Sequence, residues 1–237
     1  MSKSFRFAGA GLVALGALMA GSPSFAAPLY IGVSLNGGAT IDHEQTSSTG
    51  TDVFTTSDGT FSSIVVTAQG TPPNPEPTLL SNTIDFNSSG AGTLTVLITG
   101  TNEFPLVPGF LSSFTSNSLP SGWSVTEATY VNNCAAPLPS ACGTYPSSDV
   151  FNTTNLLSST TFTAAGASSS GVISPIKLQS DYAITEVFTI TATGAGSTND
   201  TIDLVATPLP GALPLFAGGL GVLGLLARRK KKTVATI

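Results

Sequence analysis

The carboxylates are the first residues of this sequence whose types allow chemistry. A glycoside hydrolase uses two facing carboxylates, and these can lie far apart in the chain because only their separation in space matters. Glu103, Glu127 and Glu186 are the candidates for such a pair. These residues carry the hypothesis of an extracellular hydrolase. We consider it after two other functions, described below, because it also needs a cleft around the two carboxylates.

Nucleophilic and cofactor-dependent chemistry has less support. The only histidine, His43, has Asp42 and Glu44 as neighbours, which point to opposite sides of a strand, so a Ser-His-Asp triad would need partners from elsewhere. The sequence contains no Gly-x-Ser-x-Gly elbow, phosphate loop or His-Glu-x-x-His pattern. We therefore predict a non-enzymatic protein with no catalytic residue and no cofactor.

Metal binding would need clustered ligands, and the sequence has only two tight acidic groups, Asp42-His43-Glu44 and Asp200-Thr201-Ile202-Asp203. Carboxylates are suitable calcium ligands, but neither group has the spacing of a known calcium loop. One histidine and two cysteines cannot supply the four ligands of a zinc site. We expect no metal site, and calcium binding is the alternative.

Aromatic side chains carry the second functional hypothesis, a carbohydrate-binding module. Trp123, Tyr130, Tyr145 or Tyr182 would stack on sugar rings if they lay on an exposed face. Trp123 and Tyr130 are seven residues apart and face opposite sides of a regular strand, so one should be in the core and the other outside. At least two coplanar exposed rings would support this function.

The elements that must position these residues are strands. Residues 93–99 place Leu94, Val96 and Ile98 on one face and threonines on the other, as a half-buried strand does. Other short segments rich in β-branched and aromatic residues are bounded by Gly, Asn, Ser or Pro. The predicted strands are residues 29–35, 60–67, 82–86, 93–99, 122–131, 181–193 and 201–206.

Strands at this spacing, with no amphipathic helix between them, predict an all-β domain folded as an antiparallel β-sandwich. Residues 70–78, 107–122 and 137–174 are rich in Pro, Ser, Thr, Asn and Gly, and we expect them to be loops. The inner faces should contain Phe61, Ile64, Leu94, Val96, Trp123, Val125, Ile184, Phe188, Ile190, Ile202 and Leu204.

The C-terminal segment has the pattern of a membrane anchor. Residues 209–227 form a run of 19 residues without a charge, which as a helix would be about 28 Å long, enough to span a bilayer core. Arg228, Arg229, Lys230, Lys231 and Lys232 follow as a stop-transfer cluster that is held on the cytoplasmic side. Residues 233–237 are then a cytoplasmic tail.

The N-terminal segment predicts export. Lys3 and Arg6 precede an apolar stretch at residues 8–20, and Ser24-Phe25-Ala26 is a small-x-small cleavage site ahead of Ala27. Residues 1–26 are therefore a signal peptide read by the Sec export machinery and removed between Ala26 and Ala27. The domain that remains outside the cell spans residues 27–207.

Signal peptide, exported domain, proline-flanked tripeptide, glycine-rich span and basic cluster, in that order, resemble the bacterial PEP-CTERM sorting architecture in its Pro-Leu-Pro variant. Pro208-Leu209-Pro210 matches the tripeptide, with Leu209 in place of the usual glutamate, and residues 208–232 form the whole sorting signal. A literal Pro75-Glu76-Pro77 also occurs, but no apolar run follows it, so we interpret it as a loop.

The resemblance implies a processing enzyme and a destination. An exosortase in the inner membrane would cut near Pro208-Leu209-Pro210 and remove the helix. The domain would then reach the cell surface or the extracellular matrix of a Gram-negative bacterium that makes extracellular polysaccharide, which is a possible partner.

The charges divide along the same boundaries. All 13 acidic residues lie between Asp42 and Asp203, whereas Lys177 is the one basic residue of residues 27–207, so this part has a formal charge of −12. Such a charge argues against nucleic acid as a partner. It suits a soluble domain outside the cell.

The sequence contains two cysteines, Cys134 and Cys142. Because the chain is expected to be exported, we predict a disulfide between them.

The leading functional hypothesis is an exported, non-enzymatic protein of the cell surface or matrix, delivered by its C-terminal sorting signal.

Overall fold

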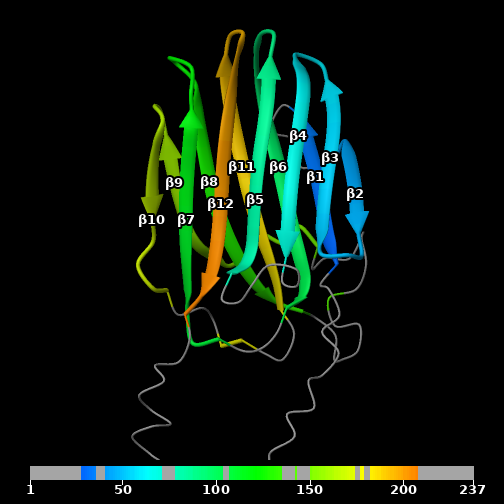
Figure 1. Cartoon of the computed structure of the whole chain (residues 1–237), viewed down its shortest axis with the longest axis vertical. Coiled ribbons are helices and arrows are strands. Elements are labelled where there is room, and N and C mark those ends of the chain that lie inside the picture. Colours follow the sequence, from blue (N-terminus) through cyan, green and yellow to red (C-terminus); the bar gives the residue numbers. More distant parts are fainter. Residues whose placement is uncertain are drawn as a thin grey trace, which may run out of the picture.

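The computed structural model describes residues 28–35, 41–70, 78–103, 107–134, 142, 150–173, 177–178 and 182–207. These residues form twelve strands and no helix, arranged in two six-stranded antiparallel sheets that face one another (Figure 1). The predicted all-β class and antiparallel β-sandwich are confirmed. The disulfide-bonded Cys134 and Cys142 lie at one end of the strands.

The first sheet has the order β2-β1-β6-β11-β8-β9 and the second has the order β10-β7-β12-β5-β4-β3. The strands of the first sheet are β1 (Leu29–Leu35), β2 (His43–Ser47), β6 (Ala91–Glu103), β8 (Ser124–Asn133), β9 (Leu156–Phe162) and β11 (Tyr182–Thr193). Those of the second are β3 (Thr51–Asp58), β4 (Phe61–Gly70), β5 (Thr78–Ser88), β7 (Phe110–Ser118), β10 (Gly166–Ser169) and β12 (Gly196–Ala206).

Alternation along each strand explains why these segments pair in this way. In β4, Ile64, Val66 and Ala68 are buried, while Thr67 and Gln69 between and after them are exposed. One face of the strand therefore belongs to the core and the other to solvent. A register shift between Phe61 and Ser63 brings the Phe61 side chain into the same core.

The core is one apolar layer between the two sheets, and aromatic rings fill its upper part. Phe86 packs edge-on against Phe61 and stacks on Trp123, with ring centroids 5.8 Å apart in both pairs. All eleven residues that the sequence predicts for the inner faces are buried. The apolar alternation therefore identified the core correctly.

The predicted loops at residues 107–122 and 137–174 are partly wrong, because they contain β7, β9 and β10. Strand β7 shows the physical reason: its inward positions include Ser112 and Ser116 beside Phe110 and Phe114. Buried hydroxyls interrupt the apolar alternation by which strands are recognised. Strands β2 and β3 were also missed, and β5 and β12 are longer than predicted. Of the predicted loop at residues 70–78, residues 71–77 lie outside the described residues.

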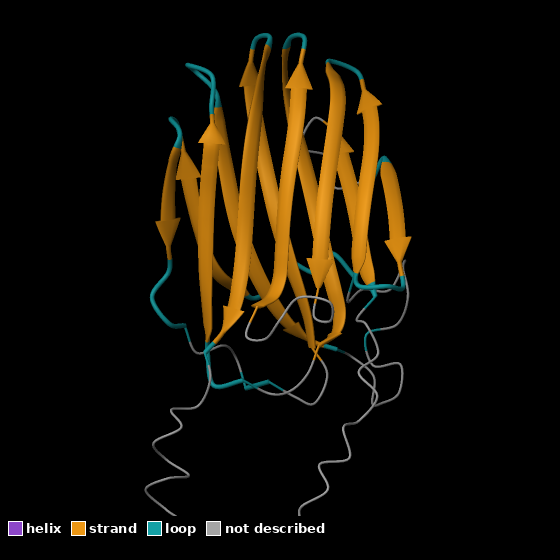
Figure 2. Ribbon diagram, viewed as in Figure 1, coloured by secondary structure: helices purple, strands orange, loops and turns teal. Residues whose placement is uncertain are grey.

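The two ends of the sandwich differ. Turns of two residues connect β3 to β4, β5 to β6 and β11 to β12 at one end, where Gly59 has a φ of 54° that suits a tight turn (Figure 2). Strand β1 begins and β12 ends at the opposite end, which we call the base. The described chain thus enters and leaves the domain at the base.

The predicted terminal segments, residues 1–26 and 208–237, lie outside the described residues. Within the part of the chain that the structure describes, no helix is long and apolar enough to cross a membrane. The signal peptide, the transmembrane helix at residues 209–227 and the basic cluster therefore stay predictions.

The core can be tested by truncating its central aromatic ring. We expect Phe86→Ala to lower the free energy of unfolding by about 3–5 kcal/mol, because Phe86 is buried and contacts two other rings. Val53→Ala is the control, since Val53 is 62% exposed on the edge strand β3, and it should change stability by less than about 0.5 kcal/mol. Chemical denaturation followed by Trp123 fluorescence measures both, and equal effects would contradict this core.

Candidate functional site

The aromatic residues proposed to stack on sugars do not form an exposed platform. Trp123 is buried against Phe86, and Tyr182 is fully buried with its ring edge toward Phe110. Both assignments are therefore wrong, because these rings complete the core. Tyr130 is half-buried on the outer face of the first sheet, opposite to Trp123 as the spacing predicts, and Tyr145 lies outside the described residues.

No exposed pair of rings replaces them among the described residues, whose exposed large apolar side chains are Val53, Leu156 and Val172. These three are aliphatic and scattered over β3, β9 and the segment after β10. Sugar stacking on a flat aromatic surface is thus not available in the described part of the chain.

The carboxylates proposed for hydrolysis lie inside the sandwich. Glu127 of β8 is paired with Phe188 of β11, and Glu186 of β11 is paired with Ile98 of β6, so both side chains share the core face. Each is 0% exposed. A substrate reaches neither carboxyl, which overturns their assignment as a catalytic pair. Glu103 ends β6, and its side chain is not among those described.

A third acid joins this layer from the opposite sheet. Asp200 of β12 is also fully buried, between Ile84 of β5 and Ser116 of β7 in the strand register. We call Glu127, Glu186 and Asp200 the buried carboxyl cluster. The sequence grouped Asp200 with Asp203, but the side chains of these two residues point to opposite faces of β12.

Hydrogen bonds connect the two sheets through this polar layer. Asn82 of β5 donates its side-chain amide to Glu186 Oε2 at 2.5 Å, and the hydroxyls of Ser112 and Thr129 are 2.6 Å apart. Thr198 donates to Asp200 Oδ2 at 2.9 Å. No ordinary hydrogen bond from a described residue reaches Glu186 Oε1, Asp200 Oδ1 or either carboxyl oxygen of Glu127.

Burial therefore controls the protonation of the cluster. Desolvation, reinforced by the charge of Asp200, raises the pKa of Glu127 to about 9, and the backbone of Thr115 offsets this only in part. Desolvation also raises the pKa of Glu186, although its bond from Asn82 opposes the shift. The pKa of Asp200 rises to about 6, mainly through burial. At neutral pH Glu127 is therefore a neutral acid.

Metal coordination has no support in the described residues, where no group of three or more His, Cys, Asp or Glu side chains could hold an ion. Asp42 instead accepts a hydrogen bond from the backbone N–H of Leu35 at 2.8 Å, which ties the start of β2 to the end of β1. His43 begins β2, and its side chain is not described. The calcium alternative at Asp200 and Asp203 is wrong, because the two carboxyls lie on different faces.

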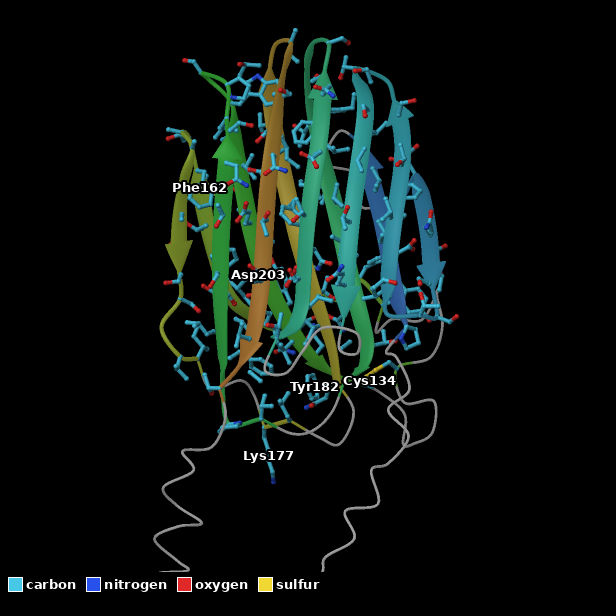
Figure 3. All side chains as sticks on the ribbon, in the orientation of Figure 1. Cys134, Phe162, Lys177, Tyr182 and Asp203 are labelled. Carbon is cyan, nitrogen blue, oxygen red and sulfur yellow. A yellow bond between two sulfur atoms is a disulfide. The ribbon has the colours of Figure 1, made fainter. Side chains whose placement is uncertain are left out.

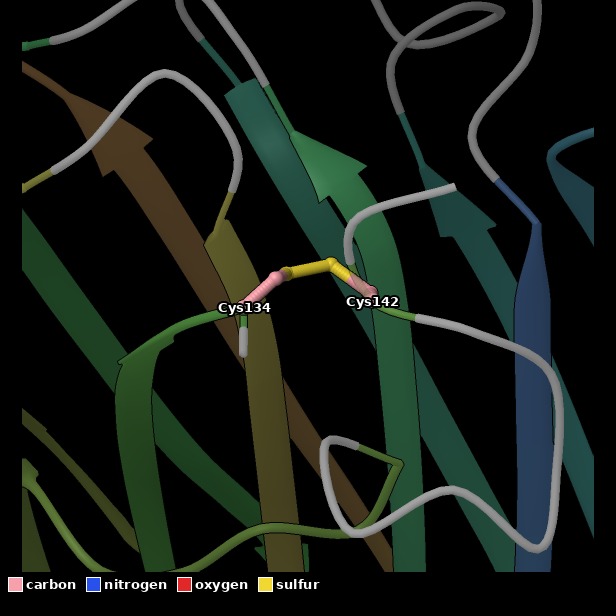
Figure 4. Close-up of a disulfide and its surroundings, with 2 residues drawn as sticks. All are labelled: Cys134 and Cys142. Atoms are coloured by element: carbon pink, nitrogen blue, oxygen red, sulfur yellow. A yellow bond between two sulfur atoms is a disulfide. The ribbon is translucent and has the colours of Figure 1, made fainter. Parts of the chain in front are cut away.

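The predicted disulfide between Cys134 and Cys142 is present, with the two Cα atoms 4.5 Å apart (Figure 4). Cys134 directly follows β8, and Figure 3 places it at the base near Tyr182 and Lys177. Asn133 donates to the carbonyl of Lys177 at 3.0 Å in the same region. The disulfide stabilises the end of the sandwich at which the chain enters and leaves.

The outer face of the first sheet is partly covered. Residues 150–155 cross it, held by Asn132, whose side chain bonds the carbonyl of Asn152 and the backbone N–H of Asn155. Phe151 lies against Gly32, where a Cβ would be only 2.8 Å from its ring. A larger residue there would force the Phe151 ring to shift, and this segment explains why Thr99 and Thr185 are buried on an outer face.

The outer face of the second sheet carries an accessible, hydrogen-bonded polar arrangement that spans three strands. Asn117 of β7 donates to Asn199 of β12 at 2.5 Å, and Asn199 donates to Asp85 of β5 at 2.6 Å. We call these three residues the amide row. Beside it, the hydroxyls of Thr83 and Thr201 are 3.0 Å apart, and Ser81 donates to Asp203. This face is the candidate binding site.

Sequence reasoning missed the amide row because its residues come from three strands separated by more than 30 positions. The outward phase of each strand could be read from the sequence, since Asp85 alternates with Ile84 and Phe86, and Asn199 with Thr198 and Asp200. The register that aligns the three strands could not be read from the sequence. Amide, carboxylate and hydroxyl groups together provide donors and acceptors for the hydroxyls of a sugar.

Comparisons with known proteins leave the family open: no family model and no curated protein matches this chain. Among solved structures, it is similar to TmCBM61 in complex with β-1,4-galactotriose, with 11% identity and a TM-score of 0.33 over 60% of this chain and 82% of that one. A structure from work on carbohydrate-binding modules of the β-sandwich superfamily has 11% identity and a TM-score of 0.32, covering 75% of this chain and 83% of that one. This similarity identifies no binding residue.

The buried carboxyl cluster predicts an unusual dependence of stability on pH. Glu127 stays protonated in the native state while the unfolded state ionises above pH 4.5. Its stabilising contribution is thus complete below pH 4.5 and is lost as the pH rises toward 9, by up to about 1.4 kcal/mol per pH unit. Asp200 adds to this loss of stability between pH 3.8, its ordinary pKa, and about pH 6, its pKa in the folded domain.

Glu127→Gln removes the first of these titrations, so we expect the variant to be more stable than the parent at pH 8 and to lose less stability between pH 5 and 8.5. Glu44→Gln is the matched control, because Glu44 is exposed on β2. Urea denaturation across this pH range measures the slopes. Identical slopes for the parent and Glu127→Gln would show that Glu127 does not cause the loss.

Proposed function

We propose that this chain is an exported, non-enzymatic protein of the cell surface or extracellular matrix, and that an exosortase processes its C-terminal sorting signal. One observation carries the proposal: the described fold fills the space between the two predicted signals. Strand β1 begins at Leu29, two residues after the expected cleavage site at Ala27. Strand β12 ends at Ala206, two residues before Pro208.

The geometry is consistent with a domain displayed on a tether. The described chain enters and leaves at the base, so a C-terminal anchor would leave the turn end and the outer face of the second sheet accessible (Figure 1). Glu127 and Glu186 are buried in the core, which supports a binding or structural role over catalysis. The disulfide at the base suits an oxidising compartment.

Processing can be tested by expressing the full chain in a host with and without an exosortase. We expect the mature protein to begin at Ala27 and to end close to Pro208 only when the enzyme is present, as measured by intact mass and cell fractionation. Pro208→Ala combined with Pro210→Ala should leave the tail attached. Pro75→Ala combined with Pro77→Ala is the matched control and should be processed normally. A full tail in the membrane fraction of both hosts would contradict the sorting proposal.

Binding of extracellular polysaccharide is the second candidate function, favoured by the amide row and its neighbouring hydroxyls. Asp85 and Asn117 are exposed and Asn199 is half-buried, so their donors and acceptors face solvent. The formal charge of −12 in residues 27–207 favours a neutral polymer over an anionic one.

We expect Asp85→Ala combined with Asn199→Ala to weaken binding to a neutral polysaccharide by about tenfold, because two hydrogen-bonding positions are lost. Thr191→Ala is the control, since Thr191 is exposed on the outer face of the first sheet. Affinity electrophoresis against a panel of neutral polysaccharides provides the measurement. Equal losses in both variants, or no binding by the parent, would remove this candidate.

A further inference from the structure

The two flanks of the sandwich differ in charge. Strands β9 and β10 end the two sheets on one side, and β2 and β3 end them on the other (Figure 1). An edge strand presents backbone N–H and C=O groups that another strand can pair with. We call residues 156–173, which include β9 and β10, the neutral flank, and residues 42–58, which include β2 and β3, the acidic flank.

The acidic flank has the protection that edge strands commonly carry. It contains Asp42, Glu44, Asp52 and Asp58 within 17 residues. In a domain with a charge of −12, a second copy approaching this flank would meet carboxylates with its own. Like charges opposite one another disfavour strand pairing.

The neutral flank has no such protection. Residues 156–173 contain no charged residue and no proline. All four residues of β10, Gly166 to Ser169, are exposed, and among the described residues β10 pairs only with β7. Their small side chains allow another backbone to approach closely. The buried ring of Phe162, labelled in Figure 3, would lie 3.6 Å from a Cβ on Gly166, so the core is already covered by β9 where β10 begins.

We propose that the neutral flank is a self-association surface, at which β10 of one copy pairs antiparallel with β10 of a second copy and continues the second sheet across the dimer. The same edge meets itself in this arrangement, which is the isologous contact of a twofold dimer. The charge distribution favours a second copy of this chain as the partner. The neutral flank is the side on which two copies of an acidic domain can approach without opposing carboxylates. Because β10 has four residues, the association is weak and concentration-dependent.

Sedimentation velocity of the full chain in detergent, over a range of protein concentrations, tests the proposal. The parent should dimerise, and Ser168→Lys should weaken the dimer by at least about fivefold, because the new charges oppose one another across the twofold axis. Ser57→Lys is the matched control, since Ser57 is exposed on the acidic edge strand β3, and it should leave the dimer unchanged. Thermal unfolding verifies that both variants fold.

A charge-swap experiment separates strand pairing from other causes of association. Ser168→Asp alone should weaken the dimer as Ser168→Lys does, whereas an equimolar mixture of the two variants should restore it, because opposite charges then face one another. A parent that stays monomeric at every concentration would overturn the proposal. So would a dimer that Ser168→Lys leaves intact, which would place the contact in another part of the chain, and so would a mixture that fails to recover.

Discussion

Burial of one face of every sheet in a single shared layer is the constraint on which this structure depends. Neither sheet has a helix to cover it in the described residues, so each must bury its apolar face against the other. The rings of Phe86 and Trp123 stack within this layer, and Phe110 and Tyr182 close it near the base. Any binding surface of the described domain must therefore lie on its outer faces, its edge strands or its ends.

The same layer contains polar groups, which calls for a physical explanation. A neutral carboxylic acid in a core is costly unless it is well hydrogen-bonded, and the backbone of Thr115 compensates the burial of Glu127 only in part. The bonds that do form, from Asn82 to Glu186 and between Ser112 and Thr129, each join one sheet to the other. They require one relative position of the two sheets, whereas apolar contacts tolerate several, so we interpret them as specifying the alignment at the expense of stability.

The strand phase read from the sequence predicts much of this architecture, and each place where the prediction is wrong has a definite physical cause. The alternation at residues 93–99 predicts β6, but the inward serines of β7 and the uncharged polar run of β9 and β10 carry no apolar signal. The strand phase could even have located the buried acids, because Glu127 lies on the same face of its strand as Val125 and Val131, and Glu186 lies midway between Ile184 and Phe188. Locating the amide row needed the strand order as well, which no local pattern contains. The predictions for residues outside the described part of the chain rest on sequence patterns alone.

The direction of the strands decides what pairing at the neutral flank would connect. Identical edges pair antiparallel, so the twofold axis turns one copy upside down relative to the other. In each domain β1 begins and β12 ends at the base, and the two bases of such a dimer therefore point in opposite directions. Neighbouring copies anchored side by side in one membrane cannot adopt this arrangement. Copies released from the membrane, or held on two facing surfaces, can adopt it, so the proposed pairing is compatible with the proposed matrix location and not with lateral clustering of anchored copies.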